Sequence, residues 1–168
     1  MESVIRTLNE LVDRGVIEGF AIGGATALIY FSTPMLTEDI DVFVEIKKKG
    51  PLVDLSHIYS FLIEKKNSKV EGEYVFIDGF PVQFLVPYDE LSKEAFEATI
   101  PVSYSGLSVR IFSLEYLMAI MIQLNKPKYR ERLRLLMEEG NFDDALLSKI
   151  LASHNLLGRW DILRKEIR

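Results

Sequence analysis

The chain has 168 residues, of which 48% are hydrophobic and 27% are charged, so one domain with a buried core and at most a small appendage is expected. It contains no cysteine, which excludes disulfides and thiolate metal sites and favours a reducing, cytoplasmic compartment. The net charge of −5 argues against strong general binding to nucleic acid, so any such contact would need a local basic patch.

The first 46 residues predict two helices and two strands in alternation. Apolar side chains at helical spacing predict a helix over residues 2–14. The next predicted elements are a short buried strand over residues 20–24 that ends in a glycine turn, a short helix over residues 25–31, a loop at Pro34 and a strand over residues 38–46. The uncharged run from Phe20 to Leu36 is too short and too rich in Gly, Ser and Thr for a membrane span, so no membrane contact is expected.

The middle of the chain predicts two helices and two strand pairs. After a charged turn over residues 47–51, the predicted elements are a helix over residues 52–66, strands over residues 73–77 and 81–87, a helix over residues 88–98 and a strand pair within residues 100–112. Asp78-Gly79 and Ser105-Gly106 are the predicted turns of the two strand pairs.

The last part of the chain predicts only helices. The helical pattern begins at Ser113, breaks at Lys126-Pro127 and Gly140, and continues over residues 143–153 and 156–167. We therefore predict a mixed α/β domain over residues 1–112 and a helical subdomain over residues 113–168.

Two aspartates lie in the strand predicted over residues 38–46. Residues two apart on a strand point to the same face, so the side chains of Asp39 and Asp41 are expected to project together. Two carboxylates this close repel each other unless a cation lies between them. Mg²⁺ suits this position because it takes one or two protein carboxylates and completes its shell with water and substrate phosphates. The alternative is a solvated strand end without a metal, because Asp-x-Asp is a common pattern.

A pair of glycines lies between the first predicted strand and the short helix. Gly23 and Gly24 would let the backbone approach a ligand closely, and the start of the helix would offer free N–H groups to a phosphate. The alternative is a tight strand-to-helix turn that binds nothing.

The combined pattern is a strand, Gly-Gly, a short helix, a loop and a strand bearing Asp-x-Asp. This order resembles the signature of the nucleotidyltransferase fold superfamily, here Ile22-Gly23-Gly24 followed by Asp39-Ile40-Asp41-Val42. A threonine before the aspartates, here Thr37, resembles the pattern of the minimal and toxin–antitoxin-associated members of this superfamily. The resemblance covers residues 18–112 and, more loosely, the helices after them. It implies an α/β (α+β) fold, with a mixed β-sheet flanked by helices and a C-terminal helical subdomain.

The resemblance also implies an activity and a set of site residues. The implied enzyme is a Mg²⁺-dependent nucleotidyltransferase, which moves a nucleoside monophosphate from a nucleoside triphosphate to a hydroxyl of a protein, an RNA or a small molecule. Asp39 and Asp41 are its implied metal ligands and catalytic residues, and Gln83 stands at the position of a third catalytic carboxylate. The residues implied for nucleotide binding are Gly23, Gly24, Thr26, Thr37, Lys128 and Arg130.

The third acidic position departs from the family pattern. Val82 and Phe84 alternate into the core, so Gln83 is expected to point the same way as the aspartates. An amide cannot accept a proton at neutral pH and is a poorer Mg²⁺ ligand than a carboxylate. Glu73 and Asp78 are the nearby acids, and Asp78 is better explained by its turn.

The basic stretch over residues 126–134 also departs from the family pattern. Lys128-Tyr129 stands where members of the family often carry Lys-Asp. The cations of this stretch are expected either to contact a triphosphate or an RNA backbone, or to form a solvated helix face. The alternative to an enzyme is therefore a catalytically inactive nucleotide-binding or protein-interaction module of the same fold, related to a toxin–antitoxin pair.

Overall fold

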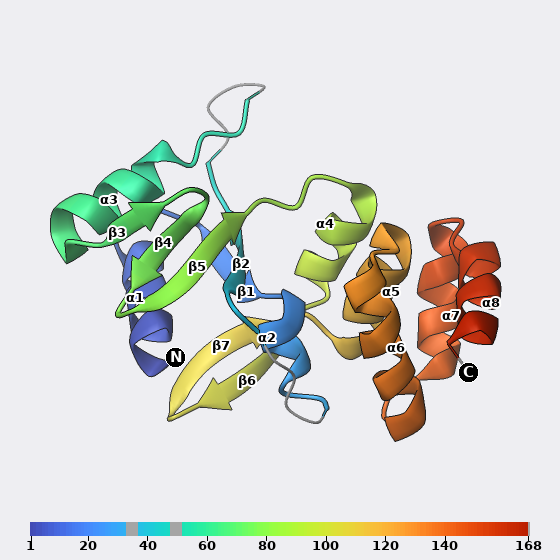
Figure 1. Cartoon of the computed structure of the whole chain (residues 1–168). Helices are drawn as coiled ribbons and strands as arrows, with labels where there is room; N and C mark the ends of the chain where they lie inside the picture. Colours follow the sequence, from blue (N-terminus) through green and yellow to red (C-terminus); the bar gives the residue numbers. More distant parts are fainter. Residues whose placement is uncertain (33–36, 48–51, 168) are drawn as a thin grey trace.

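The computed structural model describes residues 1–32, 37–47 and 52–167. The predicted loop at Pro34 and most of the charged turn predicted over residues 47–51 lie outside the described residues. The sequence predicts a mixed sheet flanked by helices, and this prediction is confirmed (Figure 1).

The sheet has seven strands in the order β3-β4-β5-β2-β1-β7-β6. The strands are β1 (Gly19–Ile22), β2 (Ile40–Glu45), β3 (Lys69–Glu71), β4 (Tyr74–Ile77), β5 (Phe80–Leu85), β6 (Ile100–Tyr104) and β7 (Leu107–Ile111). β2 runs parallel to β5, and β1 runs parallel to β7, whereas the other neighbouring pairs are antiparallel. As a result, one edge of the sheet gathers the start of β2 and the ends of β1 and β7.

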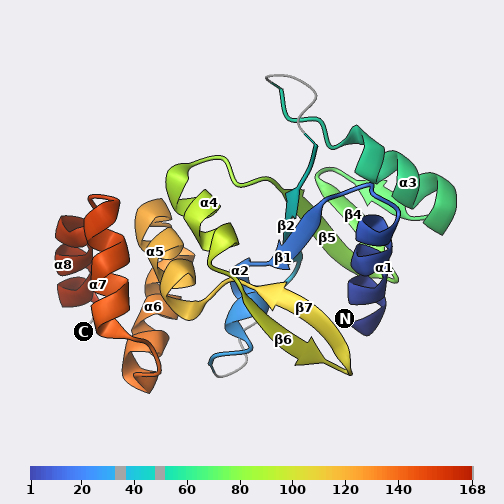
Figure 2. The same cartoon turned by 180° about the vertical axis from the view of Figure 1, so that it is seen from behind.

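Eight helices surround the sheet in the part of the chain that the structure describes. They are α1 (Glu2–Asp13), α2 (Gly24–Leu28), α3 (Ser56–Lys66), α4 (Glu90–Glu97), α5 (Leu114–Leu124), α6 (Pro127–Glu139), α7 (Asp144–Ser153) and α8 (Leu157–Glu166). Figures 1 and 2 show that α5 to α8 lie together at the opposite end of the molecule from α3 and β3. The helix α2 contacts both β2 and α5, so it connects the sheet to the helical end.

The core is built from the apolar faces that the sequence pattern indicates. Val4, Ile5, Leu8 and Leu11 follow helical spacing and are buried where α1 packs on β1, β4 and β7. Burying an aliphatic side chain of this size stabilises the fold by about 1.5–3 kcal/mol. The same cluster of buried side chains extends through the strands into α5, α6, α7 and α8.

Both predicted hairpin turns are present. Asp78 and Gly79 connect β4 to β5, and Ser105 and Gly106 connect β6 to β7. All four residues have positive φ values, as a two-residue turn of the right twist requires. These turns fix the register of each hairpin, so Tyr74 lies opposite Gln83.

Two details of the sheet differ from the sequence prediction. The short strand β3 was not predicted, because Lys69, Val70 and Glu71 are all exposed and show no buried alternation. In addition, β2 begins at Ile40, so Asp39 precedes the strand instead of lying within it.

The C-terminal helices begin and end where the sequence indicates. Pro127 is the first residue of α6, and Gly140 ends this helix with a φ of 65°. The side chain of Asp143 accepts a hydrogen bond from the backbone N–H of Leu146 and caps α7. Among the described residues, no helix is both long and apolar enough to cross a membrane. The division into two domains at residues 112 and 113 stays a prediction.

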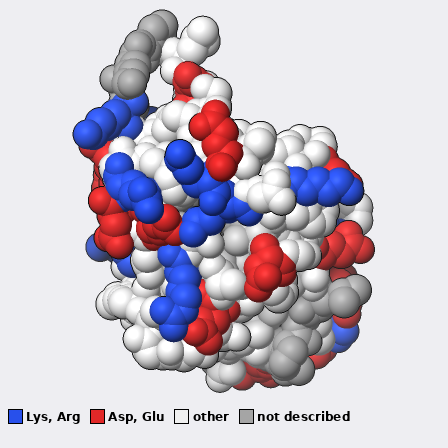
Figure 3. Space-filling model, turned by 90° about the vertical axis from the view of Figure 1, so that its left-hand side faces the viewer, with Lys and Arg blue, Asp and Glu red and all other residues white. Residues whose placement is uncertain are grey.

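The surface on the side of α1 and α3 carries charges of both signs. Figure 3 shows Lys and Arg side chains interspersed with Asp and Glu on this face. Glu10 accounts for part of the mixture because it pairs with both Arg14 and Lys66. The face therefore offers no extended field of a single sign to a nucleic acid.

Candidate functional site

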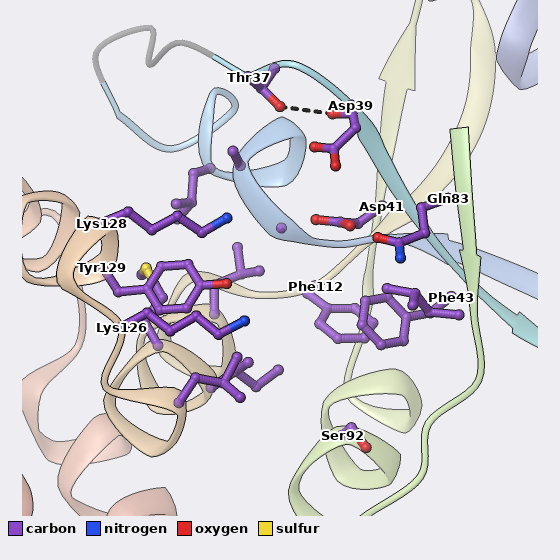
Figure 4. A pocket seen from close by; sticks show the side chains of 18 of the residues that line it. Thr37, Asp39, Asp41, Phe43, Gln83, Ser92, Phe112, Lys126, Lys128 and Tyr129 are labelled. Atoms are coloured by element: carbon purple, nitrogen blue, oxygen red, sulfur yellow. Dashed lines mark hydrogen bonds between the residues drawn. The ribbon is translucent and has the colours of Figure 1, made fainter. Parts of the chain in front are cut away.

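A cavity of about 740 Å³ lies between the sheet and the helical end of the molecule. Its walls come from the sheet edge where β2 begins, from the start of α2, and from α5 and α6. Figure 4 shows Asp39, Asp41 and Gln83 on one side of this cavity, with Lys126, Lys128 and Tyr129 pointing toward them from the other.

Two threonine hydroxyls fix the backbone of Asp39. Its carbonyl oxygen accepts a hydrogen bond from the Thr37 hydroxyl at 2.7 Å and another from the Thr26 hydroxyl at 3.2 Å. These bonds hold the chain where it enters β2, and they leave the Asp39 carboxylate pointing into the cavity (Figure 4). The two threonines therefore position an acidic side chain through the backbone.

The two glycines make room for the side chains of β2. A Cβ atom on Gly24 would lie 1.7 Å from Oδ2 of Asp41, and the φ of Gly24 is +55°. A Cβ atom on Gly23 would lie 2.7 Å from Cε2 of Phe43. The backbone N–H of Gly23 also donates a 2.9 Å hydrogen bond to the carbonyl oxygen of Asp41. The glycine pair is thus a steric requirement of Asp41 and Phe43, and Gly24 itself lines the cavity.

Asp41 is the titratable group of the cavity whose environment is most unusual. Burial, and then the negative charge of Asp39, raise its pKa from 3.8 to about 6. The positive charges of Lys128 and Arg132 act in the opposite direction. A cation between the two carboxylates would relieve both the burial cost and the repulsion.

Gln83 lies directly opposite Asp41 across the parallel pair of β2 and β5. Its amide Nε2 donates a 2.9 Å hydrogen bond to Oε2 of Glu73, which immediately precedes β4 and also lines the cavity. The Tyr74 hydroxyl lies close enough to the carboxylates of Asp39 and Glu73 for their charges to act on it. Partial burial, and then the charges of these two acids, raise the pKa of Tyr74. The structure therefore brings a third carboxylate, that of Glu73, to the acidic wall.

The opposite wall carries positive charge. Lys126, Lys128 and Arg132 line the cavity from the start of α6. The Nζ atom of Lys128 lies 5.3 Å from the centre of the Tyr129 ring, and the guanidinium carbon of Arg132 lies 5.8 Å from it. Such cation–π contacts hold long side chains in place. Burial, and then the charge of Asp41, raise the pKa of Tyr129, so its phenol stays protonated at neutral pH.

An aromatic pair forms the apolar part of the cavity. The rings of Phe43 and Phe112 lie 4.6 Å apart between centres and are tilted by 33°. Leu117, Ile120 and Met121 of α5 extend this apolar surface. Phe112 is fully buried and packs behind Phe43, whose ring is partly exposed.

A fixed polar group closes the cavity near α4. Oδ1 of Asp89 accepts a 2.8 Å hydrogen bond from the backbone N–H of Ser92, and Oδ2 accepts a 2.6 Å hydrogen bond from Nε2 of Gln123. Both carboxylate oxygens are therefore engaged in structural bonds. They hold the start of α4 against α5.

The structure brings most of the predicted site residues together. Gly24, Thr37, Asp39, Asp41, Gln83 and Lys128 all line the cavity. Gly23 and Thr26 do not line it, but each supports the backbone of β2 or of the segment before it. Arg130 does not reach the cavity, because its guanidinium forms a 2.9 Å ion pair with Glu166 of α8. Arg132, which sequence reasoning did not single out, lines the cavity instead.

The remaining site residues that sequence reasoning missed are Phe43, Phe112 and the α5 side chains. Apolar side chains are expected in a core as much as in a cavity wall, and no signal in the sequence separates the two. The sequence also does not show that Arg132 lines the cavity in place of Arg130. The direction of a side chain on α6 depends on how this helix packs on α5.

The residues present fit a magnesium ion. Within residues 1–32, 37–47 and 52–167, no group of three or more His, Cys, Asp and Glu side chains is arranged as a complete metal site. Mg²⁺ does not need one, because it often takes one or two carboxylates and leaves its other positions to water and phosphate oxygens. Asp39 and Asp41 supply such a pair, and burial, followed by the charge of Asp39, raises the pKa of Asp41.

Comparisons with known proteins place this architecture among solved structures. No protein-family model matches the chain. No curated protein matches it either. An antigenic nucleotidyltransferase-like protein from Paracoccidioides brasiliensis matches 99% of this chain and 92% of its own chain, with 15% identity and a TM-score of 0.57. The antibiotic-resistance factor ANT(2″)-Ia matches 96% of this chain and 94% of its own, with 15% identity and a TM-score of 0.54.

The structural similarity establishes the fold, whereas sequence identities of 15% leave the activity open. The matches nevertheless extend over nearly the whole chain, helical end included. Together with the strand order and the placement of Gly23-Gly24 beside Asp39 and Asp41, they show that this chain has the nucleotidyltransferase fold.

Proposed function

We propose that this protein is a Mg²⁺-dependent nucleotidyltransferase, which transfers a nucleoside monophosphate from a nucleoside triphosphate to an acceptor hydroxyl. The observation that carries the proposal is a single cavity in which two carboxylates face Lys128 and Arg132. The size of the cavity, about 740 Å³, suits a small-molecule ligand. The nucleotidyltransferase fold supports the proposal through the similar structures.

The opposed charges explain how a triphosphate would be held. Asp39 and Asp41 alone would repel phosphates, so these residues would hold Mg²⁺, which neutralises negative charge on the phosphate oxygens when it is bound. Lys128 and Arg132 would bind phosphate oxygens from the opposite wall, where Tyr129 holds both side chains. The aromatic pair of Phe43 and Phe112 would exclude water from the part of the cavity that these residues line.

The transfer itself is a displacement at phosphorus. The acceptor oxygen forms a bond to the α-phosphorus and loses its proton, while the bond from this phosphorus to the bridging oxygen breaks and pyrophosphate leaves. In this reaction the protein mainly positions the reactants and stabilises charge.

The direct test is a transfer assay with each of the four labelled nucleoside triphosphates, Mg²⁺ and a panel of protein, RNA and small-molecule acceptors. We expect labelled product with at least one pair, and loss of product in the D39N/D41N double variant. The matched control is E45Q, because Glu45 lies exposed on the same strand and outside the cavity. The absence of transfer from all four nucleotides would refute the proposal, whether or not a nucleotide binds.

The amide at Gln83 favours a second candidate, a nucleotide-binding or protein-interaction module of the same fold without catalysis. Such a module would bind a nucleotide without forming product, and Asp39→Asn would leave its function intact. A toxin–antitoxin role belongs to this alternative and would be indicated by the neighbouring gene. An increase of transfer in the Q83D variant would instead show that an active site is otherwise assembled.

A further inference from the structure

Proton removal from the acceptor hydroxyl needs a base, and the identity of this base depends on the transfer proposed above. The acidic side chains that line the cavity are Glu38, Asp39, Asp41, Glu73 and Asp89. Asp39 and Asp41 are the metal ligands of the proposed site. Asp89 is committed to Ser92 and Gln123 through both of its carboxylate oxygens. Glu38 and Glu73 therefore remain as candidates.

Among the described residues, hydrogen bonds hold Glu73 in place, whereas none holds the side chain of Glu38. The Glu38 side chain is exposed and has no hydrogen bond or ion pair with the described part of the chain. Oε2 of Glu73 accepts the 2.9 Å hydrogen bond from Nε2 of Gln83. The backbone carbonyl of Glu73 accepts a 3.4 Å hydrogen bond from the Tyr59 hydroxyl. A base must be held close to the proton that it removes, and this condition favours Glu73.

The strand register brings Glu73 to the metal side of the cavity. Asp41 pairs with Gln83 across β2 and β5, and Gln83 pairs with Tyr74 across β5 and β4. Glu73 is the residue before Tyr74, the first residue of β4, and its carboxylate reaches the Gln83 amide at this start of the strand. The acid that position 83 lacks is therefore supplied one strand farther along the sheet.

We infer that Glu73 is the catalytic base of this site and that Gln83 is the positioning residue that holds it. Glu73 takes the proton of the acceptor hydroxyl as the oxygen–phosphorus bond forms and pyrophosphate leaves. The exposed side of Glu73 then passes this proton to solvent. The Gln83 amide donates an N–H hydrogen bond to the carboxylate. An acid at position 83 could donate a hydrogen bond only in its protonated form, through its O–H.

The test compares single acid-to-amide variants of the full chain. E73Q keeps the shape of the side chain, so we expect it to lower kcat by about 100-fold or more while the KM for the nucleotide changes by less than about threefold. Calorimetry with Mg²⁺ should give wild-type nucleotide affinity for E73Q. The matched controls are E71Q, on the neighbouring strand and outside the cavity, and E38Q, the other candidate. Both should keep the wild-type kcat.

Exchange of the two side chains provides a rescue. The E73Q/Q83E double variant keeps an amide and a carboxylate facing each other but moves the acid to position 83. We expect it to recover at least about tenfold of the kcat that E73Q loses, because either position can present the base to the same acceptor. Q83A should lower kcat without changing nucleotide affinity, since Glu73 would lose its positioning bond.

The outcomes separate this inference from the proposed function. A wild-type kcat in E73Q, a loss that appears only in KM, or a loss in E38Q instead of E73Q would overturn the role of Glu73 and leave the transferase intact. Failure of the wild-type protein to transfer any nucleotide would overturn the proposed function, and the role of Glu73 with it. Thermal unfolding of each variant confirms that the comparison is between folded proteins.

Discussion

The carboxylate of Asp41 occupies the volume that a side chain at position 24 would need. Gly24 combines this contact with a positive φ, so two separate requirements select glycine at one position. The charged form of Asp41 is disfavoured by burial and by the nearby charge of Asp39, and the positive charges of Lys128 and Arg132 offset this in part.

Substitution of Gly24 by alanine separates these two requirements. G24A should lower the free energy of unfolding by about 2–4 kcal/mol, because a left-handed φ and a displaced Asp41 side chain add together. G15A is the matched control, since Gly15 has a φ of +66° and no atom near its added Cβ. It should cost only about 1 kcal/mol. Denaturant unfolding measures both values, and equal costs would show that contact with Asp41 has no weight.

The pKa of Asp41 predicts a dependence of stability on pH. The folded protein holds the Asp41 proton up to a pH of about 6, whereas the unfolded chain releases it near 3.8. The contribution of Asp41 to the free energy of unfolding is therefore full below the lower value and is lost as the pH rises through 6, by about 1–3 kcal/mol. In metal-free buffer, D41N should be more stable than the wild type at pH 7.5 and should lack this fall.

Chemical unfolding from pH 4 to pH 8 measures this difference, with E45Q as a control that keeps the wild-type slope. Added Mg²⁺ should stabilise the wild type above pH 6 and leave D41N unchanged, because the cation replaces the lost proton. A D41N variant with the same pH dependence as the wild type would contradict the assignment.

The helix α6 presents its cations to two different surroundings. Arg132 turns into the cavity beside Tyr129, whereas Arg130 pairs with Glu166 on α8 and Arg134 pairs with Glu131 and Glu138. The sequence leaves open whether these cations contact a ligand or form a solvated face, and α6 has cations in both surroundings. The difference arises from the rotation of α6, which its buried residues Leu133 and Leu136 determine.

The two arginines provide a direct comparison of these faces. R132A should weaken the binding of nucleoside triphosphate by about tenfold, because a charge-assisted bond to a phosphate is lost. R130A should leave this affinity unchanged and affect only the exposed contact with α8, which is worth about 1 kcal/mol or less. Calorimetric titration of both variants tests the assignment, and equal losses of affinity would show that α6 binds through a different face.

The sequence predicts elements well where local chemistry decides them. The turns at Asp78-Gly79 and Ser105-Gly106, the proline at the start of α6 and the glycine at its end each follow from backbone preferences. It does not reveal β3, because the exposed side chains of this strand carry no alternation, and β3 forms through hydrogen bonds to β4 alone.

At the scale of the whole molecule, the cavity exists because the helical end lies against the sheet edge. Asp39 and Asp41 could be predicted as neighbours from strand periodicity, and Gln83 could be predicted to face the same way. The depth of the cavity, the Phe43–Phe112 pair and the choice of Arg132 over Arg130 depend on the packing of α5 and α6. Contacts between residues so far apart in the sequence leave no local signal.

The arrangement also explains why Gln83 does not by itself exclude catalysis. The sheet places the start of β4 next to Gln83 of β5, so the residue before β4 can supply the carboxylate that position 83 lacks. Sequence reasoning identified Glu73 as a nearby acid, and the structure adds the hydrogen bond that connects it to Gln83.

A crystal structure of the protein with a non-hydrolysable nucleoside triphosphate and Mn²⁺, which replaces Mg²⁺ and scatters anomalously, tests the central claim most directly. We expect an anomalous peak coordinated by the carboxylates of Asp39 and Asp41, with the triphosphate between this ion and the side chains of Lys128 and Arg132. A nucleotide bound outside the cavity, or a nucleotide inside it without a metal peak at either aspartate, would contradict the account.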